Sequence, residues 1–181
     1  YDDARHFSPG SIEGSAGHTV SLYSLSKAYG FASWRIGWMV VPERLFEPIR
    51  KIQDTILICP PVISQWAAVG AISAGRAYCQ EKLRETREIR QLVLDRLGKI
   101  RHIVTVPRAD GAFYLLLRVH ADVEPMDLVR RLIEEHRVAV IPGSTFGVEG
   151  ECLLRVAYGA LRKETAAEGI GRLVRGLKEI L

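Results

Sequence analysis

Four polar residues near the start of the chain combine groups that suit a phosphate and a reactive carbonyl. Ser24, Ser26 and Lys27 follow an apolar run at 19–23, and Arg35 stands at the entrance to the next apolar run. A buried lysine loses its charge readily and attacks a carbonyl to form a Schiff base. Hydroxyl and guanidinium groups bind phosphate oxygens through hydrogen bonds. These residues indicate a site for a phosphate-bearing aldehyde; the alternative is a surface lysine and a salt-bridged arginine between ordinary strands.

A fifth candidate, Arg155, lies far along the chain within the apolar run 153–157. A charge inside an apolar strand is costly unless an opposite charge satisfies it. The planar guanidinium of arginine pairs well with a carboxylate through two parallel hydrogen bonds. That carboxylate belongs either to a bound substrate or to an Asp or Glu of the chain, and the residue pattern leaves both interpretations open.

Two short apolar runs flank Lys27, and both are predicted to be buried strands. They cover residues 18–24 and 35–41, and short continuous apolar runs are typical of strands inside a sheet. A helix is predicted to begin at Pro42, because proline fits the first helical turn, and to end before the prolines at 60 and 61.

From Ser64 onward the pattern changes to helices and then to a mixture of elements. The first of these helices is predicted to break at Gly75, and a long amphipathic helix follows over 76–97 with a charged, solvated face. The remaining chain has the alternation of an α+β layer. Its predicted strands are 103–106, 112–117, 138–141 and 153–157, and its predicted helices are 125–136 and 163–181.

The composition excludes several classes of function. The 181 residues are 48% hydrophobic and 25% charged, and the net charge of +4 is scattered without a basic block, which gives no support for nucleic-acid binding. The three cysteines lie far apart and the five histidines are dispersed, so neither disulfides nor a metal site is expected. No apolar run reaches membrane-spanning length, and no phosphate-loop or dinucleotide glycine motif is present. We therefore expect a cytoplasmic, metal-free protein that binds neither nucleic acid nor membrane.

The pattern Ser-x-Ser-Lys at 24–27, followed by Arg-Ile-Gly at 35–37, resembles the cofactor-lysine segment of class I/II aminotransferases. These are the fold-type I enzymes that use pyridoxal 5′-phosphate (PLP). The match is specific, because it involves several residue types over one short stretch. One departure is Ser33, where relatives usually carry glycine. The segments 111–114 and 141–147 are also similar to parts of the small domain in that family.

The resemblance implies a role for each candidate residue. Lys27 is expected to form the Schiff base with PLP and, once released, to move the substrate α-proton as general base and acid. Ser24, Ser26 and Arg35 are expected to bind the cofactor phosphate, and Arg155 the substrate α-carboxylate. The implied reaction moves an amino group between an L-amino acid and a 2-oxo acid.

The resemblance covers nearly the whole chain and implies the C-terminal portion of the enzyme, with an α/β plus α+β fold. Residues 1–88 are expected to be the remainder of a large PLP-binding domain with a mostly parallel sheet. Residues 89–181 are expected to form a small α+β domain, with the helix 76–97 bridging the two. The implied full-length enzyme is a homodimer. Because an Asp that keeps the PLP pyridine protonated is expected upstream of this chain, we expect the chain alone to be inactive.

Other functions remain open at this level. A PLP-dependent carbon–sulfur lyase or an aminocyclopropane-carboxylate synthase would share every motif quoted, and a binding module without chemistry is a further alternative. The substrate is also undetermined. Some dicarboxylate-specific relatives carry an Arg near the position of Cys59, and none is present at 57–61, which disfavours an aspartate preference.

Overall fold

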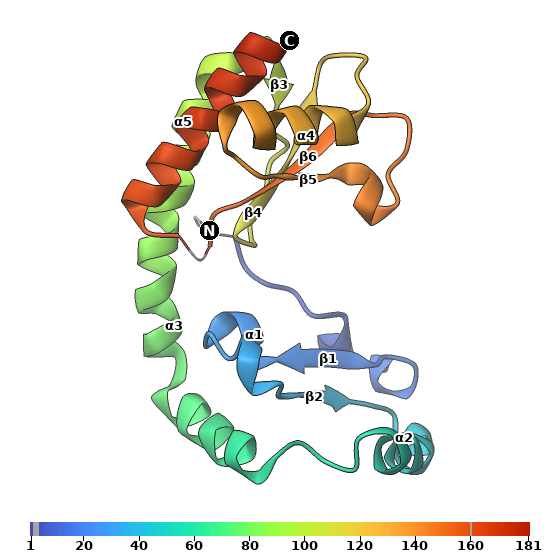
Figure 1. The fold of residues 1–181 in the computed structure, drawn as a ribbon. Coiled ribbons are helices and arrows are strands. Elements are labelled where there is room, and N and C mark those ends of the chain that lie inside the picture. Colours follow the sequence, from blue (N-terminus) through green and yellow to red (C-terminus); the bar gives the residue numbers. More distant parts are fainter. Residues whose placement is uncertain (2–3, 160) are drawn as a thin grey trace. The chain divides into compact units, whose positions relative to one another are not determined.

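The computed structural model describes residues 1, 4–159 and 161–181 (Figure 1). The chain divides into two compact units, Arg5–Lys82 and Leu83–Leu181 with Tyr1–Ala4, and each is described by itself. Both units share the helix α3 (Val62–Leu97). We predicted a domain boundary between 88 and 89, whereas the compact units divide between Lys82 and Leu83. Beyond this division α3 joins the core of the C-terminal unit, since Ile89, Val93 and Leu97 are buried there.

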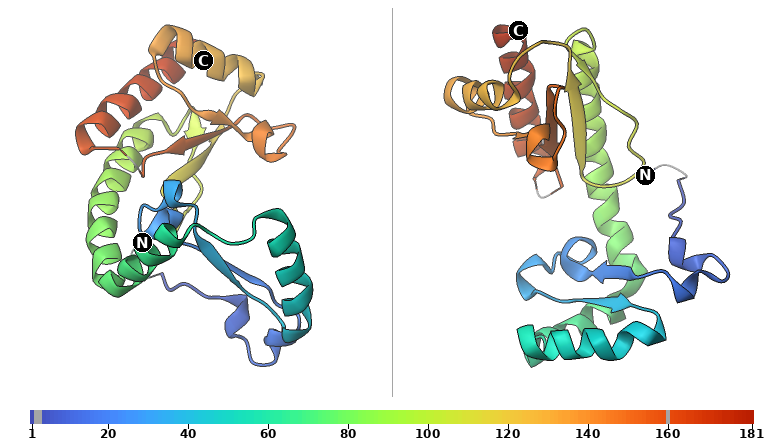
Figure 2. Two further views of the ribbon diagram at one scale, coloured as in Figure 1. Left: turned by 60° about the horizontal axis from the view of Figure 1, so that its bottom comes forward. Right: turned by 90° about the vertical axis from the view of Figure 1, so that its right-hand side faces the viewer.

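The N-terminal unit is built from short elements around one pair of strands (Figures 1 and 2). Its elements in chain order are η1 (Pro9–Ser11), η2 (Ser15–Gly17), β1 (Ser21–Ser24), α1 (Leu25–Ala28), η3 (Ala32–Trp34), β2 (Gly37–Val40), α2 (Glu43–Ile56) and the first part of α3.

The strands β1 and β2 correct the predicted large-domain sheet. In the described residues of this unit they form a two-stranded antiparallel sheet, with Ser21 opposite Val40, rather than a mostly parallel sheet. Nor are they buried: Leu22 is 72% exposed and Val40 is 57% exposed. An apolar run identifies side chains that need covering, and the described residues of this unit do not cover them. The apolar residues that it does bury include Leu25, Pro42 and Ala68.

The predicted break at Gly75 is confirmed. Here α3 is kinked, with Gly75 at φ 67° and ψ −160°, a conformation that glycine adopts without steric cost because it lacks a Cβ atom. The helix begins at Val62, slightly earlier than the predicted start at Ser64. None of the helices in the described ranges is long and apolar enough to cross a membrane.

The C-terminal unit has an antiparallel sheet and the two predicted helices, but the strand predicted at 138–141 is only Ile141–Pro142, and the strand predicted at 112–117 runs from Tyr114 to Val119. Its strand order is β3-β4-β6-β5, with every neighbouring pair antiparallel, and α4 and α5 lie side by side (Figures 1 and 2). The elements are η4 (Gly98–Ile100), β3 (Val104–Thr105), β4 (Tyr114–Val119), α4 (Pro125–His136), β5 (Ile141–Pro142), η5 (Gly143–Phe146), β6 (Leu153–Ala157) and α5 (Lys163–Ile180).

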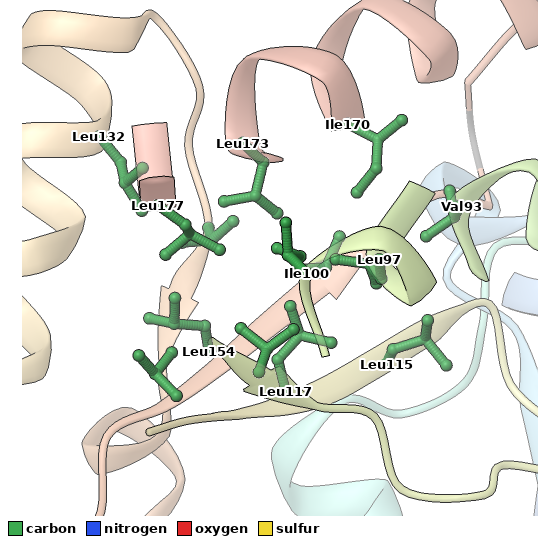
Figure 3. Close-up of a cluster of buried hydrophobic side chains, with 14 of the residues drawn as sticks. Val93, Leu97, Ile100, Leu115, Leu117, Leu132, Leu154, Ile170, Leu173 and Leu177 are labelled. Atoms are coloured by element: carbon green, nitrogen blue, oxygen red, sulfur yellow. The ribbon is translucent and has the colours of Figure 1, made fainter. Parts of the chain in front are cut away.

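Side-chain alternation along β4 gives this sheet two different faces. Leu115, Leu117 and Val119 are buried, whereas the residues between them are exposed, as expected for a strand whose neighbours point to opposite faces. The buried face packs against α3, α4 and α5 to form the core (Figure 3). Fully buried members of this core include Leu97, Leu117, Leu132, Leu154 and Leu177. The opposite face carries Tyr114, Leu116 and Arg155, because Leu116 and Arg155 are cross-strand partners.

This two-faced strand provides a stability test with an internal control. Leu117→Ala removes a side chain with no exposed surface, so we expect a loss of about 2–5 kcal/mol in the free energy of unfolding, measured by urea denaturation. Leu116→Ala, on the exposed face of the same strand, should cost less than about 1 kcal/mol. Equal losses for the two variants would contradict the assignment of the core face.

Candidate active site

Ser24 connects β1 to the short helix α1 that carries Lys27. Ser24 is extended, with φ −145° and ψ 143°, and its Oγ accepts a hydrogen bond of 3.0 Å from the backbone N–H of Ser26. This is the N-cap arrangement, in which a serine oxygen satisfies a backbone donor of the first helical turn. The cap fixes where the helix begins, and it leaves the Ser24 O–H free to donate to a ligand.

Lys27 lies in the helix that this cap starts. The turn is anchored by Leu25, which is only 2% exposed, and by the Leu25 carbonyl, which accepts from the N–H groups of Tyr29 and Phe31. Lys27 itself is exposed, in contrast to the buried lysine on which its proposed chemistry was based, and Ser26 is half-buried. The backbone hydrogen bonds of Leu25 therefore hold the turn that carries the exposed Lys27.

Arg35 follows η3 in a conformation that favours glycine. Its φ of 52° and ψ of 50° place it in the left-handed region, which a residue with a Cβ atom adopts at a cost, and such strain is concentrated at functional sites. The Nη1 atom of Arg35 donates a 2.6 Å hydrogen bond to the carbonyl of Ala32, and the side chain is exposed. Ser33, the departure from the aminotransferase pattern, lies within η3 and does not prevent this turn.

Two contacts bring the Lys27 and Arg35 turns together. Gly37 is the strand partner of Ser24, and a Cβ atom at Gly37 would clash with the carbonyl oxygen of Tyr23. The backbone N–H of Leu25, the residue after Ser24, donates a 3.4 Å hydrogen bond to the carbonyl of Ile36. The residue before Ile36 is Arg35, so both turns are attached to the same end of the β1–β2 pair. We call Ser24, Ser26, Lys27 and Arg35 the lysine cluster.

Cys79 and Tyr29 also support this cluster, and the sequence reasoning missed Cys79 in this role. The Cys79 thiol lies 3.6 Å from the carbonyl oxygen of Ala28, to which it donates, and the Tyr29 ring stacks on that of Tyr78 at 5.8 Å with an interplanar angle of 2°. The hydrogen bond with Cys79 raises the pKa of Tyr29. No local pattern in the sequence could have shown that Tyr78 and Cys79 of α3 contact the turn that carries Lys27.

Arg155 belongs to the C-terminal unit, so it is described apart from the lysine cluster. It lies on β6 between Leu116 of β4 and Ile141 of β5. Its guanidinium lies 5.2 Å from the Tyr114 ring centroid and 4.6 Å from that of Phe146. Its Nε atom is buried without a hydrogen-bond partner. We call Arg155, Tyr114 and Phe146 the arginine cluster.

The surroundings of Arg155 bear on the two interpretations left open by the sequence. Across residues 1, 4–159 and 161–181, no Asp or Glu lies within ion-pair distance of its guanidinium. Arginines nearby do have such partners; Arg118 of β4, for example, pairs with Glu151 at 3.0 Å. The intrachain salt bridge considered as an alternative is therefore not formed within the described residues. Those residues also contain no cluster of three or more metal-ligating side chains.

The chain resembles several characterised enzymes. Residues 5–173 match the family model for class I and II aminotransferases. The chain is 35% identical over 190 residues to an aromatic aminotransferase of Arabidopsis thaliana, and the match covers 100% of this chain and 45% of that protein. It is 31% identical over 182 residues to an aspartate aminotransferase of Pyrococcus abyssi, with 99% and 46% covered.

Solved structures give the same result. An aromatic aminotransferase from Pyrococcus horikoshii OT3 matches with a TM-score of 0.90 and 32% identity, covering 99% of this chain and 48% of that one. A double mutant of Thermus thermophilus aspartate aminotransferase matches with a TM-score of 0.85 and 27% identity, covering 96% and 44%. The chain therefore spans less than half of the length of these relatives. Because the family model matches most of its residues, the chain belongs to the class I and II aminotransferase family.

Proposed function

We propose that the enzyme containing this chain is an aminotransferase that uses PLP to move an amino group between an L-amino acid and a 2-oxo acid. The observation that carries the proposal is the lysine cluster: the Leu25–Ile36 hydrogen bond and the Ser24–Gly37 pairing hold an amine, two hydroxyls and a guanidinium at one end of a strand pair. The chain belongs to the class I and II aminotransferase family, and this membership is the reason to interpret the four groups as a PLP site.

The donors in the lysine cluster fit a phosphate-bearing aldehyde. The Ser24 hydroxyl accepts one backbone hydrogen bond and still has its proton to donate. Arg35 uses Nη1 for the Ala32 carbonyl, and the rest of its five N–H groups can meet phosphate oxygens. Ser26, half-buried beside them, is the third proposed phosphate contact.

The mechanism assigns separate tasks to the residues of this chain. When bound, PLP supplies an aldehyde carbon for the lysine amine and an electron sink for the substrate α-carbon. Lys27 Nζ takes the proton from the α-carbon of the amino acid and returns a proton as the 2-oxo acid forms. Arg35, Ser24 and Ser26 hold the phosphate in place. Arg155 holds the α-carboxylate through two parallel hydrogen bonds, which fixes the orientation of the α-carbon.

We also propose that the enzyme is a cytoplasmic homodimer. Supporting observations are the exposed apolar side chains Phe46, Ile56 and Trp66, at 58%, 78% and 71%, and the three cysteines, which are all free thiols. Light scattering on protein purified from the cytoplasmic fraction should give the mass of a dimer. A monomer, or recovery of the enzyme in the membrane fraction only, would contradict this proposal.

The role of Lys27 can be tested by chemical trapping in the full-length enzyme. Borohydride reduction in the presence of PLP should attach the pyridoxyl group to Lys27, as read by peptide mass spectrometry. Lys27→Ala should abolish the labelled peptide and lower the transamination rate by about 10²-fold or more, because the general base is lost. Lys51→Ala, which removes an exposed lysine of α2 in the same unit, is the matched control. Wild-type labelling and rate in Lys27→Ala would refute the assignment.

The role of Arg155 predicts a different kinetic defect. Arg155→Lys keeps the charge but loses the two parallel hydrogen bonds, so kcat/KM for the amino acid should fall about 10- to 100-fold. Arg118→Lys, on the exposed face of the adjacent strand, should have little effect because Arg118 already pairs with Glu151. If the two variants behaved alike, Arg155 would have no special part in carboxylate binding.

A further inference from the structure

Arg155 presents a physical problem that its proposed role does not explain. Before a substrate arrives, its guanidinium has no carboxylate partner within the described residues, and its Nε atom is buried without a hydrogen bond. A long arginine side chain without partners samples many rotamers, and ordering it on binding costs free energy. Something other than an ion pair must therefore hold the guanidinium before the carboxylate binds.

The two aromatic rings of the arginine cluster are placed to do this. In the strand order β4-β6-β5, Arg155 lies on the middle strand, Tyr114 comes from β4, and Phe146 comes from the turn η5 that follows β5. The rings thus reach Arg155 from its two different neighbours in the sheet, at 5.2 and 4.6 Å. Both distances are within the range of favourable cation–π contact. Each contact places the guanidinium carbon of Arg155 over an aromatic ring, which is not a carboxylate and so does not replace the ion pair that the N–H donors can form.

The backbone fixes the position of Phe146. Ile141 is the strand partner of Arg155, and a Cβ atom at Gly143 would come within 2.6 Å of Leu153 Cβ, so η5 packs closely on the strand that carries Arg155. The turn ends at Gly147 with φ 79°, a conformation that favours glycine. Phe146 is 48% exposed, so its position comes from this tight turn rather than from burial in the core.

Tyr114 is positioned by the strand pairing and by its neighbour. It is the cross-strand partner of Ala157, on the same face of the sheet as Arg155. The Phe113 ring meets it edge-on, with centroids 5.6 Å apart and an interplanar angle of 87°, a favoured arrangement of two rings. A Cβ atom at Gly159 would clash with Phe113. The start of β4 is thereby held in place.

We propose that Tyr114 and Phe146 are positioning residues that hold the guanidinium of Arg155 by its flat faces and leave its N–H edge for the substrate carboxylate. We call the two ring contacts of Tyr114 and Phe146 with Arg155 the clamp. Its purpose rests on the proposed function, whereas the contacts themselves lie within the C-terminal unit. The pair favours a planar carboxylate, because a planar anion can pair with the exposed edge without displacing either ring. Arginine suits this arrangement and lysine does not, since only the guanidinium is planar.

The clamp can be tested on this chain by nuclear magnetic resonance of the arginine side chains. The Arg155 Nε–H signal, assigned by its loss in Arg155→Lys, should be shifted by the ring currents and exchange slowly with water, because Nε is buried. Phe146→Leu and Tyr114→Leu should each move the signal and speed its exchange about 10-fold or more. Phe146→Tyr and Tyr114→Phe keep a flat ring and should restore the wild-type signal. Phe7→Leu, in the other unit and 66% exposed, is the control.

Kinetics of the full-length enzyme then connects the clamp to its purpose. Phe146→Leu should raise KM for the amino acid about 10-fold with kcat nearly unchanged, the signature of lost substrate binding. An Arg155 signal that neither leucine variant alters would overturn the clamp, whatever the kinetics show. A signal that moves while KM is unaffected by both Phe146→Leu and Arg155→Lys would overturn the carboxylate role of Arg155, and the purpose of the clamp with it. Urea midpoints of the variants close to wild type would show that the effects are local.

Discussion

The lysine cluster depends on the close approach of Gly37 to the carbonyl of Tyr23. Only a residue without a Cβ atom fits there, and this allows β1 and β2 to pair up to their ends. The Leu25–Ile36 hydrogen bond then follows directly beyond the last strand pair. A hydroxyl, an amine and a guanidinium from two separate turns are thereby fixed on one short backbone frame. Weakening this approach would separate the groups that we propose bind the cofactor.

The arginine cluster arises from a different constraint, the alternation of side chains in an antiparallel sheet. One face of β4 and β6 is fully used by the core, so its residues are determined by packing. The other face is left for Tyr114, Leu116 and Arg155, none of which the core needs. A charged residue on the central strand is tolerated because it points away from the core and meets two aromatic rings. The same sheet therefore provides the core of the unit and holds Arg155 between the two rings.

The two units differ in how completely they bury their own apolar side chains. The C-terminal unit buries a continuous core across its sheet and helices, whereas the N-terminal unit exposes Leu22, Val40 and Trp66 among many others. This difference explains the prediction that was wrong. Apolar runs at 18–24 and 35–41 correctly marked strands, but an apolar run does not reveal whether a neighbour covers it. Nor did it reveal that the two strands pair with each other in antiparallel fashion.

What the sequence by itself determined is local in the chain. The helix break at Gly75, the helices 125–136 and 163–181 and the strand 153–157 were predictable, because glycines and side-chain periodicity act over a few residues. The tertiary structure alone decided which distant residues meet. The contact of Cys79 with Ala28, and of Phe146 and Tyr114 with Arg155, follow from strand register and helix packing. These are long-range choices that depend on the whole fold, and no short pattern of residues encodes them.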